Sequence, residues 1–223
     1  ATEPGFNLSL EISLDAIPKE PEAFEAAVDK LSGIRSVIMG APLRKHFVTL
    51  ADGTCKEGAL VAVPYRTGEA YFIKPQNDQV TVVFPMRFKD PNDAVMACTF
   101  LAEFIEARRS QALTTAPSCS YHKLAPMELK DAPSALTANT NGGFVSFVLF
   151  KRHVTGKRLD SAAWRMSSFY AFVNYHIKCS KAFMHTRMRN RTATLLQVLN
   201  RAKPEVAKEK KTASGRTFVR KGI

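Results

Sequence analysis

The chain has 223 residues, of which 45% are hydrophobic and 23% charged, a balance typical of a globular protein with one large or two small domains. No apolar run approaches the ~20 residues that a membrane-spanning helix needs, and the N-terminus lacks the basic and apolar stretches of a signal peptide. The net charge of +12 is uneven: residues 1–150 hold 14 Lys and Arg against 17 Asp and Glu, whereas residues 151–223 hold 18 against 3. The last third is therefore expected to meet an acidic partner.

The N-terminal residues are predicted to form a strand and a helix. Apolar and polar residues alternate over Phe6–Leu14, which is typical of a strand with one face on a core. A helix is expected to begin near Pro21, with apolar residues at positions 24, 28 and 31. Gly40 and Pro42 predict that this helix is broken or kinked before His46.

The middle of the chain is predicted to form an antiparallel meander. Three segments, Ala59–Tyr65, Glu69–Lys74 and Gln79–Phe88, are separated by short turn sequences. A second helix is expected from Asp90 and Pro91, with its inner face at positions 95, 100, 101, 104 and 105.

Residues 111–142 are rich in Ala, Thr, Pro and Asn. They are predicted to hold short strands around Cys119–His122 and Met127–Leu129 within a longer loop. The next segment, Gly143–Phe150, is almost entirely apolar and is predicted to be a central strand of the same sheet as Phe6–Leu14.

The C-terminal third is predicted to be one long helix. The pattern runs from Asp160, near the N-terminus of the helix, to Arg201, and Pro204 ends it. Its apolar stripe has only helical spacings and consists of Phe169, Val173, Ile177, Met184, Met188, Leu195 and Leu199. The expected fold is thus α+β: a twisted antiparallel sheet with packed helices over residues 1–158, a long helix over 159–203 and a basic tail over 204–223.

The sequence shows no clear catalytic or metal-binding pattern. The sequence has no GxSxG, GxxxxGK or HExxH motif, and no dinucleotide fingerprint. His176 and Cys179 share one face of the helix, but His185 points to the opposite side, so the three cannot bind one ion. The four cysteines form no CxxC pair, which is typical of free thiols in a reducing compartment. We expect no catalytic residue, no metal and no cofactor.

Two binding functions remain. Lys178, Lys181 and Arg189 are predicted to lie away from the apolar stripe, with Arg187 and Arg191 at its edge. One possibility is a basic RNA-binding module, although the phenylalanines at positions 169, 172 and 183 are expected on the apolar side rather than exposed for base stacking. The other is a permanent helical partner: the helix spans ~63 Å, whereas a compact domain of the preceding residues is ~40 Å across, so part of the stripe needs an external cover.

The sequence resembles the family of p34-type subunits (subunit 2) of the actin-related protein 2/3 complex. The segments that carry the resemblance are YHIKCSKAFMHTRMRNRTATLLQVLNRAKP, DQVTVVFPMRFKDPNDAVMACTFLAEFIEARR, PMELKDA, GFVSFVLFKRH and KTASGRTF. They extend in order over residues 3–218, and the stretch around IKCSKAF and HTRMR is highly specific.

The resemblance implies a fold and a role. Family members have two α/β domains and a long C-terminal helix, and this chain corresponds to the second domain and the helix. The helix is implied to pair with subunit 4, and the complex to bind the side of an actin filament in the cytoplasm and nucleate a branch. The apolar stripe then fits the subunit seam. The basic residues fit the filament contact, for which the expected set is Lys178, Lys181, Arg187, Arg189 and Arg191, with Lys208, Lys210 and Lys211 as weaker candidates.

Overall fold

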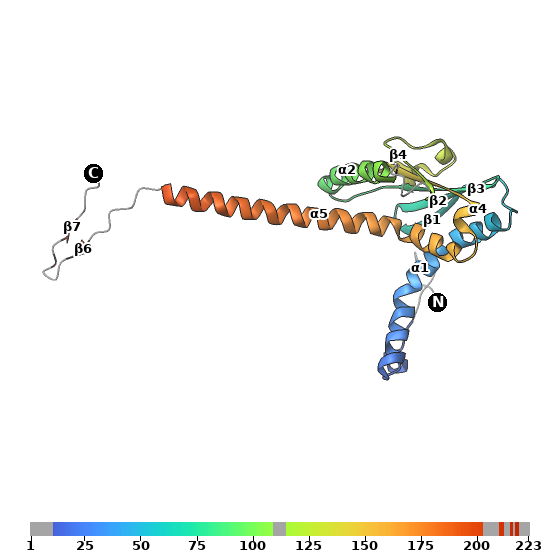
Figure 1. The fold of residues 1–223 in the computed structure, drawn as a ribbon, viewed down its shortest axis with the longest axis horizontal. Coiled ribbons are helices and arrows are strands. Elements are labelled where there is room, and N and C mark those ends of the chain that lie inside the picture. The colour runs from blue at the N-terminus through green and yellow to red at the C-terminus, as the bar shows by residue number, and fades with distance from the viewer. Residues whose placement is uncertain (1–10, 109–114, 203–209, 212–214, 216, 219–223) are drawn as a thin grey trace. The chain divides into compact units, whose positions relative to one another are not determined.

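The computed structural model describes residues 11–108, 115–202, 210–211, 215 and 217–218 of the chain. The chain divides into two compact units, residues 1–177 and residues 178–223. The first unit holds an antiparallel sheet with helices, and the second holds the last part of a long helix and a small ladder of two-residue strands (Figure 1).

The sheet of the first unit has five antiparallel strands in the order β1-β2-β3-β5-β4. Their bounds are β1 Val61–Arg66, β2 Glu69–Gln76, β3 Gln79–Pro85, β4 Ser118–His122 and β5 Phe144–Phe150. A register shift between Pro64 and Arg66 interrupts the β1–β2 ladder at the sheet edge. Proline lacks the N–H that a ladder needs, which suits Pro64 to an edge strand.

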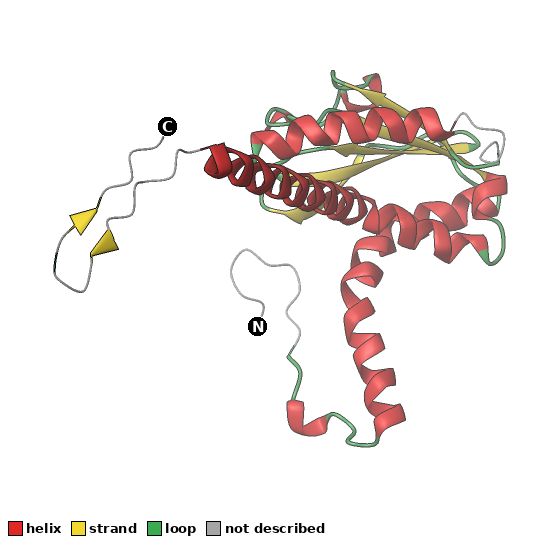
Figure 2. Cartoon of the chain, turned by 60° about the vertical axis from the view of Figure 1, so that its left-hand side comes forward, coloured by secondary structure: helices red, strands yellow, loops and turns green. Residues whose placement is uncertain are grey.

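Within the first unit, the C-terminal part of α1, helix α2 and the start of α5 lie against this sheet (Figure 2). The α-helices are α1 Pro21–Ala51, α2 Pro91–Arg108, α3 Ser134–Thr137, α4 Lys151–Val154 and α5 Arg158–Ala202. The 3-10 helices are η1 Leu14–Ala16 and η3 Met127–Leu129, and the paired short strands are β6 Lys210–Lys211 and β7 Thr217–Phe218.

The two faces of the sheet have different covers because strand residues alternate in direction. Tyr71 and Ile73 of β2 join the large core, in which one sheet face packs against the C-terminal half of α1, α2 and the first half of α5. Phe72, between them, points to the other face and packs with Leu129 of η3 and its neighbours. The large core therefore fixes the place where α5 begins.

Several sequence predictions are confirmed. The three-strand meander forms as expected, and β5 lies between β3 and β4 within the sheet. The expected strand at Cys119–His122 corresponds to β4, and the long C-terminal helix corresponds to α5. Together they confirm an α+β fold with an antiparallel sheet and a long C-terminal helix.

Two predicted strands are corrected. Met127–Leu129 is a 3-10 helix, because the N–H of Leu129 donates to the carbonyl of Pro126 (3.0 Å), a local bond typical of a tight turn. Residues 11–14 of the predicted strand Phe6–Leu14 are not in the sheet, and Leu14 begins η1. Residues 6–10 of that strand lie outside the described residues.

The predicted break in the first helix proves to be a bend. Helix α1 continues without interruption through Pro42. Proline at this position cannot donate to the carbonyl four residues earlier, and its ring crowds that carbonyl. The axis of α1 changes direction along its length (Figures 1 and 2), so the kink expected before His46 is present without a loss of helix.

Candidate partner interface on the C-terminal helix

Helix α5 is anchored in the first unit by contacts of three kinds. Its sequence contains neither Gly nor Pro between Arg158 and Ala202, so nothing in the backbone interrupts it. An ion pair joins Asp160 near its start to Arg44 of α1, with 2.7 Å between Oδ1 and Nε. The hydroxyl of Tyr170 donates to the backbone carbonyl of Arg87 (2.5 Å).

Aromatic packing adds the third contact. The Phe169 ring lies edge-on to the Phe147 ring of β5, with centroids 4.9 Å apart, and tilts against the Phe84 ring of β3 at 5.0 Å. Such pairs contribute about 0.5–1.5 kcal/mol beyond the area that they bury. The first half of α5 is therefore part of the domain core.

Burial along α5 ends abruptly at one residue. Val173 is fully buried and Ile177 is 2% exposed. From Lys178 to Ala202 every residue is exposed except Lys181, which is partly buried. Apolar residues continue at helical spacing beyond Ile177, but no described residue of this chain packs over them.

The exposed part carries a line of large apolar side chains. Met184 is 45% exposed and Met188 is 59% exposed, and Leu195 and Leu199 are about half exposed. At about 100° per residue, these four side chains fall within a sector of roughly 60° on the helix. Three further apolar residues are also exposed there: Phe183, Leu196 and Val198. Leu196 and Val198 are not in the predicted stripe, but they adjoin it and make its last two turns wider than its first.

Three of the seven residues of the predicted seam are buried within this chain. Phe169, Val173 and Ile177 belong to the core of this chain and have almost no surface left for a partner. Met184, Met188, Leu195 and Leu199 remain accessible. The same stripe serves an internal core up to Ile177 and an external surface beyond it.

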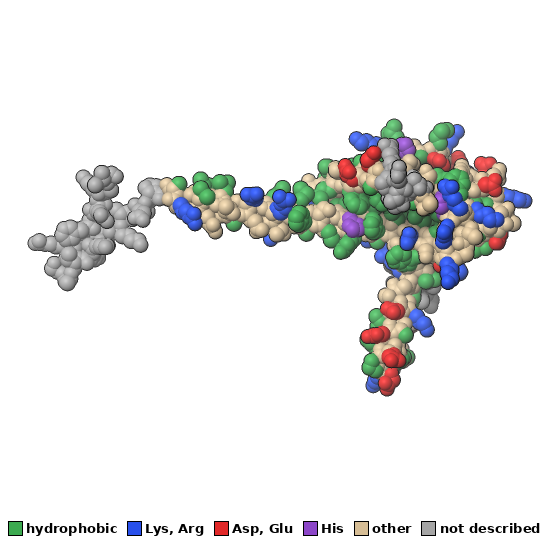
Figure 3. All heavy atoms as spheres, viewed as in Figure 1, with side chains coloured by type: hydrophobic (Ala, Val, Ile, Leu, Met, Phe, Trp, Pro, Cys, Tyr) green, Lys and Arg blue, Asp and Glu red, His purple; other side chains and the backbone are tan. Residues whose placement is uncertain are grey.

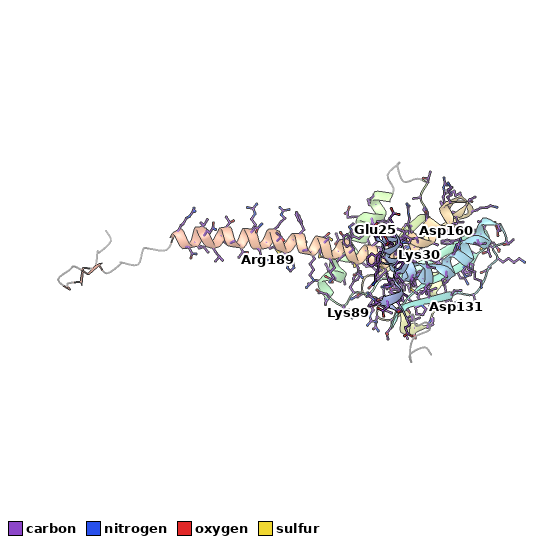
Figure 4. All side chains as sticks on the ribbon, turned by 90° about the horizontal axis from the view of Figure 1, so that it is seen from below. Glu25, Lys30, Lys89, Asp131, Asp160 and Arg189 are labelled. Atoms are coloured by element: carbon purple, nitrogen blue, oxygen red, sulfur yellow. The ribbon has the colours of Figure 1, made fainter. Side chains whose placement is uncertain are left out.

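The basic residues surround this apolar line. Lys178 and Arg189 both lie about 100–120° from it, on one flank, at about 100° per residue. Arg187 lies on the other flank, whereas Arg191 lies at the edge of the line, about 20° from Met184 at this spacing. Lys181 is corrected: it lies one turn from both Ile177 and Met184, so it shares the face of the stripe instead of pointing away. Side chains along α5 are shown in Figure 4, where Arg189 is labelled.

The weaker candidates lie in the tail. Lys208 is outside the described residues, and Lys210 and Lys211 form β6, which pairs with β7.

The aromatic side chains need a correction too. Phe169 is buried, but Phe172 is 46% exposed and Phe183 is 63% exposed, both directed away from the apolar line. The Arg187 guanidinium lies over the Phe183 ring, 5.7 Å from its centroid. This is a cation–π contact between residues one helical turn apart. Phe172 and Phe183 are therefore accessible to solvent. The expected lack of exposed aromatic side chains can no longer be used as evidence against RNA binding.

The charge on this part of α5 has one sign. Residues 161–202 contain no Asp or Glu, whereas residues 178–202 contain Lys178, Lys181, Arg187, Arg189, Arg191 and Arg201. Basic and hydrophobic side chains alternate along the segment on the face shown in Figure 3. A surface that is apolar along one line and basic beside it suits a partner that is apolar and acidic.

Other kinds of site were sought among the described residues. No group of three or more His, Cys, Asp and Glu side chains there could hold a metal ion. Within the same part of the chain, no helix has the length and apolar character needed to cross a membrane.

Comparison with known proteins places the chain. Residues 1–206 match the family described as "Arp2/3 complex, 34 kD subunit p34-Arc". This chain belongs to the p34-Arc family. It is 46% identical to actin-related protein 2/3 complex subunit 2A of Arabidopsis thaliana over 221 residues, covering 98% of this chain and 67% of the relative.

More distant relatives agree with this p34-Arc assignment. Subunit 2 of Schizosaccharomyces pombe is 36% identical over 235 residues, which cover 98% of this chain and 74% of that protein. Subunit 2 of Dictyostelium discoideum is 38% identical over 199 residues, covering 87% of this chain and 65% of that protein. The chain thus spans about two thirds to three quarters of these relatives.

Proposed function

We propose that this chain is a non-catalytic structural subunit of the actin-related protein 2/3 complex, and that residues 178–202 of α5 form its seam with a helix of subunit 4. The observation that carries the proposal is the exposed apolar line through Met184, Met188, Leu195 and Leu199 on a continuous helix. The chain belongs to the p34-Arc family, which is named as a subunit of a complex. An exposed apolar surface is expected in a protein that binds other subunits.

The size of the apolar surface supports a lasting contact. Six side chains, at positions 184, 188, 195, 196, 198 and 199, are about half exposed. Covering the exposed half of each contributes roughly 1 kcal/mol, or about 6 kcal/mol in total before the cost of association. The partner helix gains from its own burial as well. An isolated helix without tertiary contacts is marginal in water, so the seam also stabilises the helix itself.

We further propose that the basic flank of α5 contributes to binding the side of an actin filament. Lys178 and Arg189 lie on one flank of the apolar line, on the same side of the helix as Leu196. The actin surface is acidic overall, and complementary charge accelerates docking. The complex so attached would nucleate a branched filament, and the chain would act in the cytoplasm as part of the actin cytoskeleton.

No chemistry is assigned to the chain, because the family is that of a structural subunit. The alternative of a basic RNA-binding module receives no support from the relatives, all of which are named as subunits of the complex.

Capture of the tagged chain from its own cells tests the proposal. The lysate is treated with nuclease, and the captured material is identified by mass spectrometry. We expect actin-related proteins and subunit 4 in near-equal amounts to the bait. A parallel capture omits the nuclease. Recovery of the bait alone, or of partners that appear only in the capture without nuclease, would contradict the proposal.

A further inference from the structure

The exposed part of α5 contains a regular ladder of positions spaced alternately by four and three residues. Such a spacing has a period of 3.5 residues and is the pattern of two helices that supercoil around each other. We call this set the heptad ladder; it consists of Met184, Met188, Arg191, Leu195, Val198 and Ala202. All six side chains are exposed in this chain.

One position of the ladder is not apolar. Arg191 lies between Met188 and Leu195 in the heptad ladder. In a pair of supercoiled helices, the side chain at this position faces the partner helix. At about 100° per residue, Arg191 lies roughly 40° from the mean direction of Met184, Met188 and Leu195, whereas Thr192 lies roughly 60° away. Arg191 is thus closer to the centre of the seam than its neighbour.

This chain supplies no carboxylate for Arg191 from α5. The residues one turn away are Arg187, Met188, Thr194 and Leu195, and residues 161–204 contain no Asp or Glu. A guanidinium that is desolvated without a counter-charge is strongly unfavourable. Within the seam, the molecule that covers the ladder is the source of such a counter-charge.

A second copy of this chain does not meet that requirement. Residues 178–202 hold six Lys and Arg and no acidic residue, so two such helices would repel each other along their whole length. A different chain with acidic residues beside its own apolar stripe removes this repulsion.

We propose that Arg191 pairs inside the seam with a carboxylate on an acidic amphipathic helix of the partner subunit, and that this pair fixes the register of the two helices. The inference rests on the proposed function, since it assigns a role within the same seam. A single polar pair in an otherwise apolar helical interface aligns the helices, because every other register leaves it unpaired. Arg191 is then a register-setting residue rather than part of the filament contact.

The test uses the complete complex, reconstituted with fluorescently labelled chain, and measures the dissociation constant of the chain for the remaining subunits. Arg191→Leu removes the charge inside the ladder and leaves the partner carboxylate unpaired. We expect binding at pH 7.5 to weaken by about 30-fold or more. Arg201→Leu, which removes the same charge from the side of α5 that points away from the apolar line, should change binding by less than about 3-fold.

The pH dependence identifies the counter-charge as a carboxylate. In the Arg191→Leu complex the unpaired, desolvated carboxylate has a raised pKa and takes up a proton as the pH falls. In the wild-type complex the guanidinium favours the ionised form, so protonation weakens binding. The deficit of Arg191→Leu relative to wild type should therefore shrink between about pH 7.5 and pH 5.5. Groups common to both proteins, such as His185, cancel in this ratio.

Failure of the inference is distinguishable from failure of the proposed function. Equal effects of Arg191→Leu and Arg201→Leu, or a deficit that stays constant with pH, would overturn the inference. Charge at the ladder position itself would then be irrelevant to pairing. A third variant, Met184→Asp with Met188→Asp, tests the seam alone. If this variant abolishes binding while Arg191→Leu has no effect, the seam stands and only the role of Arg191 is overturned.

Discussion

The rings of Phe169 and Phe147 meet edge-on, with centroids 4.9 Å apart and planes 81° apart. This contact joins α5 to an interior strand of the sheet and makes the first half of the helix part of the domain core. Two turns later, at Lys178, burial ends and the remaining stripe is exposed. The contrast between the two halves of α5 leads to the following predictions.

Phe169→Ala should destabilise the domain. Removal of a buried phenylalanine ring leaves a cavity and costs about 3–5 kcal/mol. The matched control is Phe172→Ala, which removes the same ring from a half-exposed position and should cost less than about 1 kcal/mol. Urea unfolding of the complete chain, followed by tryptophan fluorescence from Trp164, measures both. Equal losses in the two variants would contradict the assignment of α5 to the core.

Amide hydrogen exchange should change at Ile177. In the chain without its partners, residues 163–177 should exchange slowly because they are packed on the sheet. Residues 178–202 should exchange much faster, since a helix without tertiary contacts opens readily. In the assembled complex the second segment should become protected. Slow exchange along the whole of α5 in the free chain would show that the segment needs no cover.

Stability should fall in mild acid, in part through His46 of α1. Burial, and secondarily the charge of Lys45, lower the pKa of His46 below its usual value of 6.5. The unfolded chain therefore binds a proton more readily than the folded one, and stability is lost as the pH falls below about 6.5 toward the folded pKa. His46→Gln should reduce the loss of thermal stability between about pH 7.5 and pH 5.5. Lys45→Gln should reduce it by less, because burial is the larger cause. An unchanged pH profile in His46→Gln would refute this contribution.

Charge reversal on the flank of α5 should weaken filament binding without disassembly. Lys178→Glu with Arg189→Glu replaces two favourable charges by two repulsive ones, and the effect should diminish as salt shortens the Debye length below ~10 Å. Co-sedimentation of the assembled complex with actin filaments is the measurement. Reversal of Lys89 and Lys130, exposed lysines of the α/β domain, is the matched control. Similar effects from both pairs would mean that net charge, and not this flank, is responsible.

The fold was largely predictable because its signals are local. Short turn sequences separate the apolar segments that form β1, β2 and β3, and an almost entirely apolar segment forms β5. The local sequence pattern gave a wrong prediction at Met127–Leu129, where a three-residue segment is compatible with either a strand or a helical turn. The segment forms a 3-10 helix. The local pattern also misplaced Val95, which is 68% exposed, while Ala94 and Ala97 turn inward to the core. Small residues allow α2 to approach the sheet closely, but their low hydropathy conceals this role.

The site was predictable only in part. Sequence period places Met184 and Ile177 on one stripe, but it cannot tell which of them this chain covers, since that depends on where the sheet ends. Lys181 was expected to point away from the stripe. It lies one helical turn from both Ile177 and Met184, so it points to the same face as the stripe. The exposure of Phe172 and Phe183 was missed as well. These distinctions require the packed domain.

Loss of the partner on charging the apolar line is the most direct test of the central claim. Met184→Asp with Met188→Asp places two carboxylates where the seam would be desolvated, which is strongly unfavourable without counter-charges. The matched control, Val95→Asp with Met127→Asp, charges two exposed apolar residues of the α/β domain. Each double variant is co-expressed with the other subunits, and the partner recovered per tagged chain is quantified. We predict recovery at the wild-type level for the control and almost none for the α5 variant, with the melting of its α/β domain unchanged. Wild-type recovery with Met184→Asp and Met188→Asp would show that this line of α5 is not the seam.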